Sequence, residues 1–308
     1  MLFPSFQAVF APKNYPRAIF LALVVFSCWP LGDAFLKMAR EADAPLGEVL
    51  LICGLSSMAS VFLLSAARGQ LANLRPHNWK PLVLLGLCQL TSFICWALAL
   101  PLLPLANIYI VSFLTPMVVA CMAAVFLKES FGWARAGVIV SGFVGVVVAV
   151  NPSNLFQSLD AGLPYVFLFG NMLASAAQMF LLRAVAEKEK NESTAFYSRA
   201  IMAGGGLLFC LILGFVPIKP WVFLAICGSG VIGGLGWVLL AEAYKCASAA
   251  VVAPFQYSQI IWGALIGYLF WADVPDVHLV CGAVIIIVSG LLLVRHERRI
   301  SRTMPRVN

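Results

Sequence analysis

Ten stretches of mainly apolar residues follow one another along the chain, and short polar or turn-prone segments separate them. Each stretch is about 20 residues long, which is the length that an α-helix needs to cross the hydrocarbon core of a bilayer. The breaks between them are too short to hold a soluble domain. The pattern predicts an all-α integral membrane protein with ten transmembrane helices, at residues 17–38, 46–67, 81–101, 104–127, 133–151, 162–184, 194–216, 220–243, 248–271 and 277–295.

The two halves of the chain are similar when one is shifted against the other by 144 residues. The shift pairs Gly86 with Gly230, Ser112 with Gln256, Thr115 with Gln259, and Glu129 with Asp273. Five helices per repeat is an odd number, so the second copy must enter the membrane in the opposite direction. Inverted repeats are typical of secondary transporters. We therefore expect two inverted five-helix repeats, residues 17–151 and 162–295, between an N-terminal segment 1–16 and a basic tail 296–308.

Charged residues make up only 11% of the chain, which is too few to cover a water-exposed surface. The net charge of +7 comes from Lys and Arg in short loops and near the C-terminus, and this placement argues against a nucleic-acid partner. With both termini inside, all 20 Lys and Arg residues fall on the cytoplasmic side except Lys37, Arg40 and Lys219. Because cytoplasmic loops are enriched in Lys and Arg, we expect cytoplasmic termini and a multi-pass protein of the bacterial inner membrane.

The residue types that usually carry chemistry are sparse or dispersed. The nine cysteines form no CxxC pair, and nearly all lie in apolar stretches, as small buried side chains do. The three histidines lie outside the interior of the apolar stretches, and the chain has no HExxH motif or P-loop. We therefore expect no metal, no cofactor and no catalytic residue. An integral membrane enzyme or a channel is a remote alternative, because an inverted repeat suits alternating access better than a fixed pore.

Several short motifs recur in a fixed order. The first half contains Trp96-Ala97-Leu98-Ala99-Leu100, Pro104-Leu105-Ala106-Asn107, Phe113-Leu114-Thr115-Pro116, Leu127-Lys128-Glu129-Ser130 and a glycine-rich stretch from Gly137 to Gly145. The second half contains Ala253-Pro254-Phe255-Gln256-Tyr257, Gly267-Tyr268-Leu269-Phe270 and Val274-Pro275-Asp276, and ends in Gly290. In order and spacing, residues 17–295 resemble the EamA type of the drug/metabolite transporter superfamily.

The resemblance implies a ten-helix fold, alternating access and a central cavity lined by helices of both halves. It does not name the cargo, because relatives include both exporters and importers. The chain also departs from the family pattern. Asp273 stands where glutamate is usual, Pro30 follows Trp29 where glycine is common, and the second predicted helix contains no arginine. For this reason, the substrate of a relative does not transfer by analogy.

Asp33 is the acidic residue that lies well within a predicted span. An ionised group in the hydrocarbon costs about 2.5–3.5 kcal/mol on insertion scales, so it usually faces a cavity or a partner. Trp29 and Lys37 lie one turn before and one turn after Asp33 on the same face. One interpretation is a substrate site, in which Trp29 stacks on the cargo and Asp33 binds its amine or carries a proton. The alternative is a local ion pair between Asp33 and Lys37 near the outer interface.

Other polar side chains form stripes at helical spacing on the third, sixth and ninth predicted helices. A stripe of this kind either makes hydrogen bonds between helices or lines a cavity. For the repeat-equivalent pairs Ser112/Gln256 and Thr115/Gln259 near the midplane we favour the cavity, with Ile260 facing lipid. The candidate substrate-binding residues are Trp29, Asp33, Gln89, Trp96, Ser112, Thr115, Asn171, Gln178, Trp237, Gln256, Tyr257, Gln259 and Trp262.

Four tryptophans lie away from the predicted membrane interfaces, which suits planar or cationic cargo: Trp29, Trp96, Trp237 and Trp262. We expect a secondary active transporter for a small organic metabolite, with export of an amino acid or a related zwitterion as the first choice. Import of a larger metabolite, such as S-adenosylmethionine, riboflavin or a nucleoside-like compound, is the alternative. The expected partners are this small molecule and the lipid bilayer. The stripe Gly137, Ser141 and Gly145 is expected to pack within one chain, which favours a monomer over a homodimer.

Overall fold

The computed structural model describes residues 14–127, 133–150, 159–185, 189–247 and 252–303, and every element in them is a helix. Glu129 lies outside these residues. The first half contributes α1 (Tyr15–Glu41), α2 (Leu46–Ala67), η1 (Leu71–Leu74), α3 (Trp79–Ala99), η2 (Leu100–Leu102), α4 (Leu105–Ser112), α5 (Thr115–Leu127) and α6 (Trp133–Val150). The second half contributes α8 (Leu159–Val185), α9 (Asn191–Leu213), α10 (Pro220–Cys246), η3 (Ala253–Tyr257), α12 (Ser258–Trp271) and α13 (Val277–Thr303).

Six helices in the described part of the chain are long and apolar enough to cross a membrane: Tyr15–Glu41, Leu46–Ala67, Trp79–Leu102, Gly162–Leu182, Asn191–Leu213 and Pro220–Tyr244. Shorter apolar helices occupy Leu105–Val119, Val140–Val150 and Val277–Leu292. Large apolar side chains also cover much of the outer surface, among them Phe20, Leu63, Leu211 and Leu269. Apolar surface on this scale is compatible with a lipid environment. The protein is therefore a multi-pass membrane protein.

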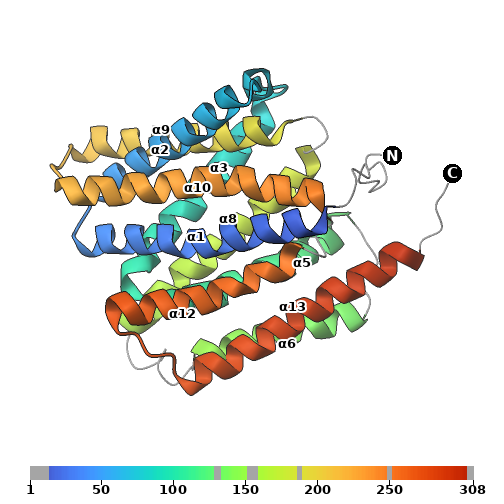
Figure 1. Ribbon diagram of the computed structural model, residues 1–308. Helices are drawn as coiled ribbons and strands as arrows, with labels where there is room; N and C mark the ends of the chain where they lie inside the picture. The colour runs from blue at the N-terminus through green and yellow to red at the C-terminus, as the bar shows by residue number, and fades with distance from the viewer. Residues whose placement is uncertain (1–13, 128–132, 151–158, 186–188, 248–251, 304–308) are drawn as a thin grey trace.

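Helices from the two halves pack against each other in a symmetric way. α1 packs along α10, and α3 packs along α8, which are equivalent contacts when each half is numbered from its first long helix. α2 packs on α9 at one flank of the bundle, and α6 packs on α13 at the other (Figure 1). α1 begins and α13 ends at the same end of the bundle. This arrangement is the two-repeat architecture that the sequence predicts.

Small residues allow the flanking helices to approach closely. A Cβ added to Gly54 of α2 would lie 2.7 Å from the backbone nitrogen of Ala203 in α9. In the other flank, a Cβ added to Gly145 of α6 would lie 2.8 Å from the side chain of Ile286 in α13. Ser141 Oγ also lies 2.8 Å from Ser289 Oγ. Ser141 and Gly145 thus pack within one chain, as their spacing predicts.

The fourth and ninth predicted helices are interrupted in the structure. α4 ends at Ser112 and α5 begins at Thr115, with a turn at residues 113 and 114. Pro116 lacks the backbone N–H that would continue the α-helical ladder, and the N–H of Met117 bonds to the carbonyl of Leu114 at 2.9 Å instead. In the second half, residues 253–257 form the 3₁₀ helix η3, which contains a proline, and α12 begins only after it. The helices predicted over 104–127 and 248–271 are therefore not continuous in the described residues, and residues 248–251 lie outside them.

Candidate functional site

Asp33, in the interior of α1, is held by two aromatic side chains. The hydroxyl of Tyr109 in α4 donates a hydrogen bond to Asp33 Oδ2 at 2.6 Å. The indole Nε1 of Trp96 in α3 donates another to Oδ1 at 3.2 Å. Three helices of the first repeat therefore meet at this carboxylate. The structure thus gives Asp33 two partners on neighbouring helices, at a depth where a carboxylate needs them.

Lys37 makes different contacts from those of the local ion pair. Its Nζ donates to the carbonyl of Leu103 at 2.9 Å and lies 3.9 Å from both Glu41 Oε1 and Asp273 Oδ2. The ammonium group also lies 4.6 Å from the ring centre of Trp271. The side chain of Lys37 is engaged at the end of α1, so the alternative of an Asp33–Lys37 ion pair is wrong.

A chain of aromatic rings leads from Asp33 into the second repeat. Trp96 and Tyr109 have ring centres 6.0 Å apart, and Tyr109 and Phe113 are 6.4 Å apart. Phe113 meets Tyr257 of η3 edge-on at 5.3 Å. Phe113 lies in the turn between α4 and α5, so the two interrupted helices meet through these rings. The candidates Asp33, Trp96 and Tyr257 thus belong to one connected cluster.

Trp29 and Trp237 form a second aromatic cluster between α1 and α10. Their ring centres are 5.9 Å apart, and Phe26 lies 5.6 Å from Trp29. The indole of Trp29 lies over Gly236, where an added Cβ would come within 2.2 Å of Nε1. Because Trp29 precedes Asp33 by one helical turn, α1 carries both clusters.

The polar stripes of α3 and α8 bond to each other. Gln178 Nε2 donates to Gln89 Oε1 at 2.8 Å. Asn171 Nδ2 donates to the carbonyl and the hydroxyl of Ser92 at 3.0 and 2.9 Å, and the hydroxyls of Ser92 and Ser175 are 2.8 Å apart. Hydrogen bonds of this kind join helices in a membrane. The candidates Gln89, Asn171 and Gln178 therefore lie in a seam between two helices.

The remaining candidates differ in exposure. Thr115 and Gln259 are buried, Gln256 is half-buried, and Trp262 of α12 is exposed. The hydroxyl of Ser112 donates to the carbonyl of Ile108 in its own helix at 2.9 Å. The lipid-facing assignment of Ile260 is wrong, because this residue is buried and its neighbour Ile261 is exposed.

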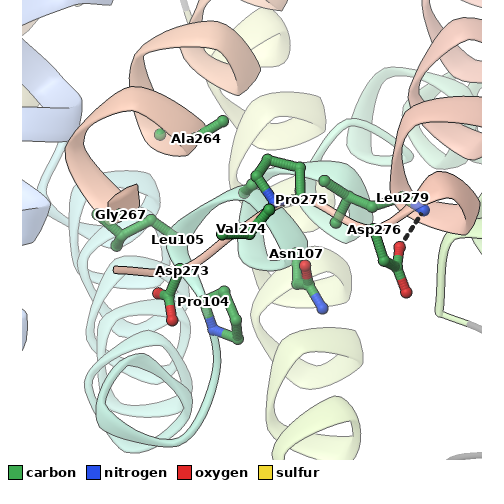
Figure 2. A pocket seen from close by; sticks show the side chains of 12 residues that line it. Pro104, Leu105, Asn107, Ala264, Gly267, Asp273, Val274, Pro275, Asp276 and Leu279 are labelled. Atoms are coloured by element: carbon green, nitrogen blue, oxygen red, sulfur yellow. Dashed lines mark hydrogen bonds between the residues drawn. The ribbon is translucent and has the colours of Figure 1, made fainter. Parts of the chain in front are cut away.

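A cavity of about 180 Å³ lies between the start of α4, the last turns of α12 and the segment that leads into α13 (Figure 2). Asn107, Asp273 and Asp276 supply its polar side chains. Asp276 Oδ1 accepts a hydrogen bond from the N–H of Leu279 at 2.7 Å and so caps α13. Asp273 Oδ2 is buried and has no hydrogen-bond partner in the described residues, although Lys37 Nζ lies 3.9 Å away. None of the candidate residues from the sequence lines this cavity as the described residues define it.

Arg199 is a polar residue whose burial the sequence interpretation did not predict. The charge pattern counts it among the cytoplasmic bases, but the structure buries it in α9, with 7% of its surface exposed. The helix begins at Asn191, three residues before the predicted start at residue 194, so eight residues of α9 precede Arg199. A buried arginine costs about 2.5–3.5 kcal/mol on insertion scales, so it faces a cavity or a partner. The polar run Asn191 to Thr194, typical of a helix start, was the signal available in the sequence.

Known proteins provide independent comparisons. The chain is 27% identical over 218 residues to the S-adenosylmethionine uptake transporter of Rickettsia prowazekii (strain Madrid E), covering 70% of this chain and 72% of that protein. It is 25% identical over 283 residues to the pseudopaline exporter CntI of Pseudomonas aeruginosa (strain UCBPP-PA14), covering 91% and 96%. It is 26% identical over 211 residues to the riboflavin transporter of Vibrio cholerae serotype O1, covering 67% and 68%.

A solved crystal structure has the same fold as this chain, with a TM-score of 0.66 over 93% of this chain and all of the other, at 17% identity. The model of the EamA-like transporter family matches the chain twice, at residues 16–151 and 162–295. These two matches cover most of the sequence and bear out the resemblance of its motifs. The protein belongs to the EamA-like transporter family, whose named relatives here are transporters and not enzymes.

Proposed function

We propose that the protein is a secondary active transporter that moves a small organic metabolite across a bacterial inner membrane by alternating access. The proposal counts ten spans, with α4 and α5 as one and η3 and α12 as another. With an even number of spans, the start of α1 and the end of α13 lie on the same side of the membrane. Figure 1 shows these two helix ends at the same end of the bundle. The distribution of Lys and Arg favours the cytoplasm for this end.

The observation that carries the proposal is the position of Asp33. Its carboxylate lies at the junction of α1, α3 and α4, and a chain of rings connects it to η3 of the second repeat. A carboxylate in this position can bind an ammonium group of the cargo or a proton. The neighbouring rings offer faces to planar or cationic groups. We propose that Asp33, Trp29, Trp96, Trp237 and Tyr257 form the substrate site.

The other candidates fall into two groups within this proposal. Thr115, Gln256 and Gln259 line the same region from the interrupted helices, as their repeat-equivalent positions favour. Gln89, Asn171 and Gln178 hold α3 and α8 together, so they support the site from behind.

Two charged clusters at opposite ends of the bundle fit alternating access. At the end formed by the α1 C-terminus, Lys37 lies 3.9 Å from Asp273, which precedes α13. At the opposite end, Glu242 of α10 pairs with Arg68, after α2, and lies 3.8 Å from Arg17 of α1. Each cluster joins the first repeat to the second. We propose that each one breaks when its own end of the transporter opens.

Export of an amino acid or a related zwitterion is the direction and cargo that we favour. The pseudopaline exporter matches over 91% of this chain, whereas the S-adenosylmethionine uptake transporter matches over 70%. Import of a larger metabolite, such as S-adenosylmethionine, riboflavin or a nucleoside-like compound, is the alternative. We propose that the protein works as a monomer, because Ser141 and Gly145 of the small-residue stripe pack on α13 within one chain.

Counterflow in proteoliposomes tests the proposal. A thermal-shift screen of the purified protein against metabolites first identifies a ligand, since a compound that binds the folded state raises its apparent stability. Proteoliposomes preloaded with this ligand are then expected to accumulate the labelled compound transiently and with saturable kinetics. Flux that rises linearly with concentration and shows no counterflow would indicate a channel instead.

A further inference from the structure

Arg199 carries a positive charge into the interior of the bundle. Its side chain is 7% exposed, and no hydrogen bond or ion pair joins it to another group in the part of the chain that the structure describes. Glu48 and Glu189, two other buried charged residues, do have partners. Glu48 accepts a hydrogen bond from the N–H of Val216 at 2.7 Å, and Glu189 accepts three from the N–H groups of His77 and Asn78, at 2.6 to 3.1 Å.

The chemistry of the guanidinium group makes this difference informative. Arginine keeps its charge and presents five N–H donors in a planar fork that matches a carboxylate in a bidentate manner. A charged guanidinium that is largely withdrawn from water and has no acceptor in the protein is unfavourable, and more so in an apolar environment. An arginine at such a position is therefore explained when an anionic ligand supplies the acceptors.

The surroundings of Arg199 are polar and weakly charged. Arg199 precedes Ala203 of α9 by one turn, and Ala203 packs on Gly54 of α2, so Arg199 lies beside the stretch of α2 that contains Cys53 and Ser57. On the other side of this stretch, Gly32, the neighbour of Asp33 in α1, packs on Ser229 of α10. Ser57 lies one turn further along the same face of α2, and its hydroxyl is buried without a hydrogen-bond partner in the described residues. α10 closes this region, because a Cβ added to Gly230 would lie 2.6 Å from the carbonyl oxygen of Cys53.

We propose that Arg199 binds a carboxylate of the transported molecule and that the cargo also carries an amine, which is directed towards Asp33. The Ser57 hydroxyl is available as a further donor to the same carboxylate. A single guanidinium matches a monoanion, whereas a phosphate dianion calls for a second cation, which Cys53, Ser57 and Asp33 do not supply. This inference deepens the proposed function and rests on it, because it names a zwitterion as the substrate class.

The test measures the charge preference of the site without measuring transport. In a variant whose other eight cysteines are replaced by serine or alanine, Cys53 is labelled with two methanethiosulfonates, anionic sulfonatoethyl and cationic trimethylammonioethyl. Both reagents attack the same thiolate, so the ratio of their rates cancels any change in thiol ionisation. We expect Arg199→Gln to lower the anionic-to-cationic ratio by about 10-fold at low salt. Arg199→Lys keeps the charge and is expected to keep most of the ratio.

Controls separate a local effect from a general one. Arg75→Gln removes the same charge at an exposed position after η1 and is expected to leave the ratio unchanged. Acetate and chloride are compared at equal ionic strength. Acetate is expected to slow the labelling of Cys53 by the anionic reagent in the protein that keeps Arg199, and not in Arg199→Gln. Stronger protection by inorganic phosphate than by acetate would assign the site to phosphate and overturn the carboxylate.

Two results overturn the proposal directly. The first is an unchanged ratio in a folded Arg199→Gln protein. The second is the absence of labelling by either reagent in the native protein, when unfolded protein reacts, because a guanidinium closed off from solutes binds none. If the native protein shows no counterflow while its labelling ratio still depends on Arg199, the result counts against the proposed function alone.

Discussion

Polar side chains meet between helices in two regions of this bundle, and their hydrogen bonding differs. In the seam between α3 and α8, neutral groups bond to one another: Gln89 to Gln178, and Ser92 to Asn171 and Ser175. Around Asp33, a carboxylate accepts hydrogen bonds from two aromatic side chains. A carboxylate has about four acceptor positions, so two donors leave half of its capacity free. The seam therefore suits helix packing, whereas Asp33 retains the capacity to bind a cation.

This difference could not be read from spacing alone. Both regions appear in the sequence as polar residues at helical intervals, and α3 contributes to both through Gln89, Ser92 and Trp96. The seam and the surroundings of Asp33 differ in which residue of a neighbouring helix faces each polar side chain. A polar stripe in a membrane helix therefore indicates a functional site only when the opposite helix fails to satisfy it.

The largest effect is expected for Asp33→Asn, which removes the charge and keeps the shape of the side chain. Transport should fall by about 10-fold or more, because the ionised group no longer binds the amine or proton of the cargo. Counterflow in proteoliposomes measures this loss, and size-exclusion chromatography checks that the variant folds. Transport at the parental rate would show that Asp33 serves only to join α1, α3 and α4.

Tyr109→Phe is expected to have the next largest effect. It removes the 2.6 Å hydrogen bond to Asp33 Oδ2 and keeps the ring contacts with Trp96 and Phe113. A hydrogen bond to a charged group contributes about 1.5–3 kcal/mol, so kcat/KM for transport should fall by about 10-fold. Tyr268→Phe on the exposed side of α12 provides the matched control and should be silent. Equal effects of the two substitutions would remove Tyr109 from the site.

Smaller effects are expected at the interrupted helices. Gln256→Ala and Gln259→Ala should each weaken substrate binding more than Thr115→Val does. Removing a glutamine amide that hydrogen-bonds the cargo leaves the bonded group of the cargo unpaired, at a cost of about 1–3 kcal/mol. Cysteine scanning offers a second readout once the native cysteines are removed. Substrate should slow thiol labelling at positions 256 and 259 and leave the exposed Ile261→Cys unaffected. Protection at 261 alone would show that the face of α12 is assigned wrongly.

The sequence predicted the parts of the fold that follow from solvent and symmetry. Long apolar runs indicate a lipid environment, and the similarity of the two halves indicates two repeats; the structure contains long apolar helices, and helices of the two halves pack in equivalent pairs. The interruptions at residues 113–114 and 253–257 were missed, because an apolar run continues through them even though the backbone ladder does not. Pro116 was the local signal for the first of them.

The candidate site was predicted less completely than the fold. Asp33 was identified because an acid within a span is rare, but its partners depend on how α3 and α4 cross α1. Arg199 was overlooked because a base close to a helix end resembles a cytoplasmic loop residue in the charge pattern. Its burial depends on how α9 packs against α2 and α3, which the charge pattern does not contain.

The smallest effect on transport is expected in the seam, where Asn171→Ala removes both bonds to Ser92. Hydrogen bonds between membrane helices contribute about 0.6 kcal/mol on average and about 1.7 kcal/mol at most, so the thermal midpoint should fall by a few degrees. Transport per folded molecule should stay within about twofold of the parent, because the seam satisfies its own polar groups and leaves none for the cargo. Thermal unfolding and counterflow on the same preparation compare the two quantities. A variant with parental stability and abolished transport would contradict the division between seam and site, since it would place Asn171 in contact with the cargo.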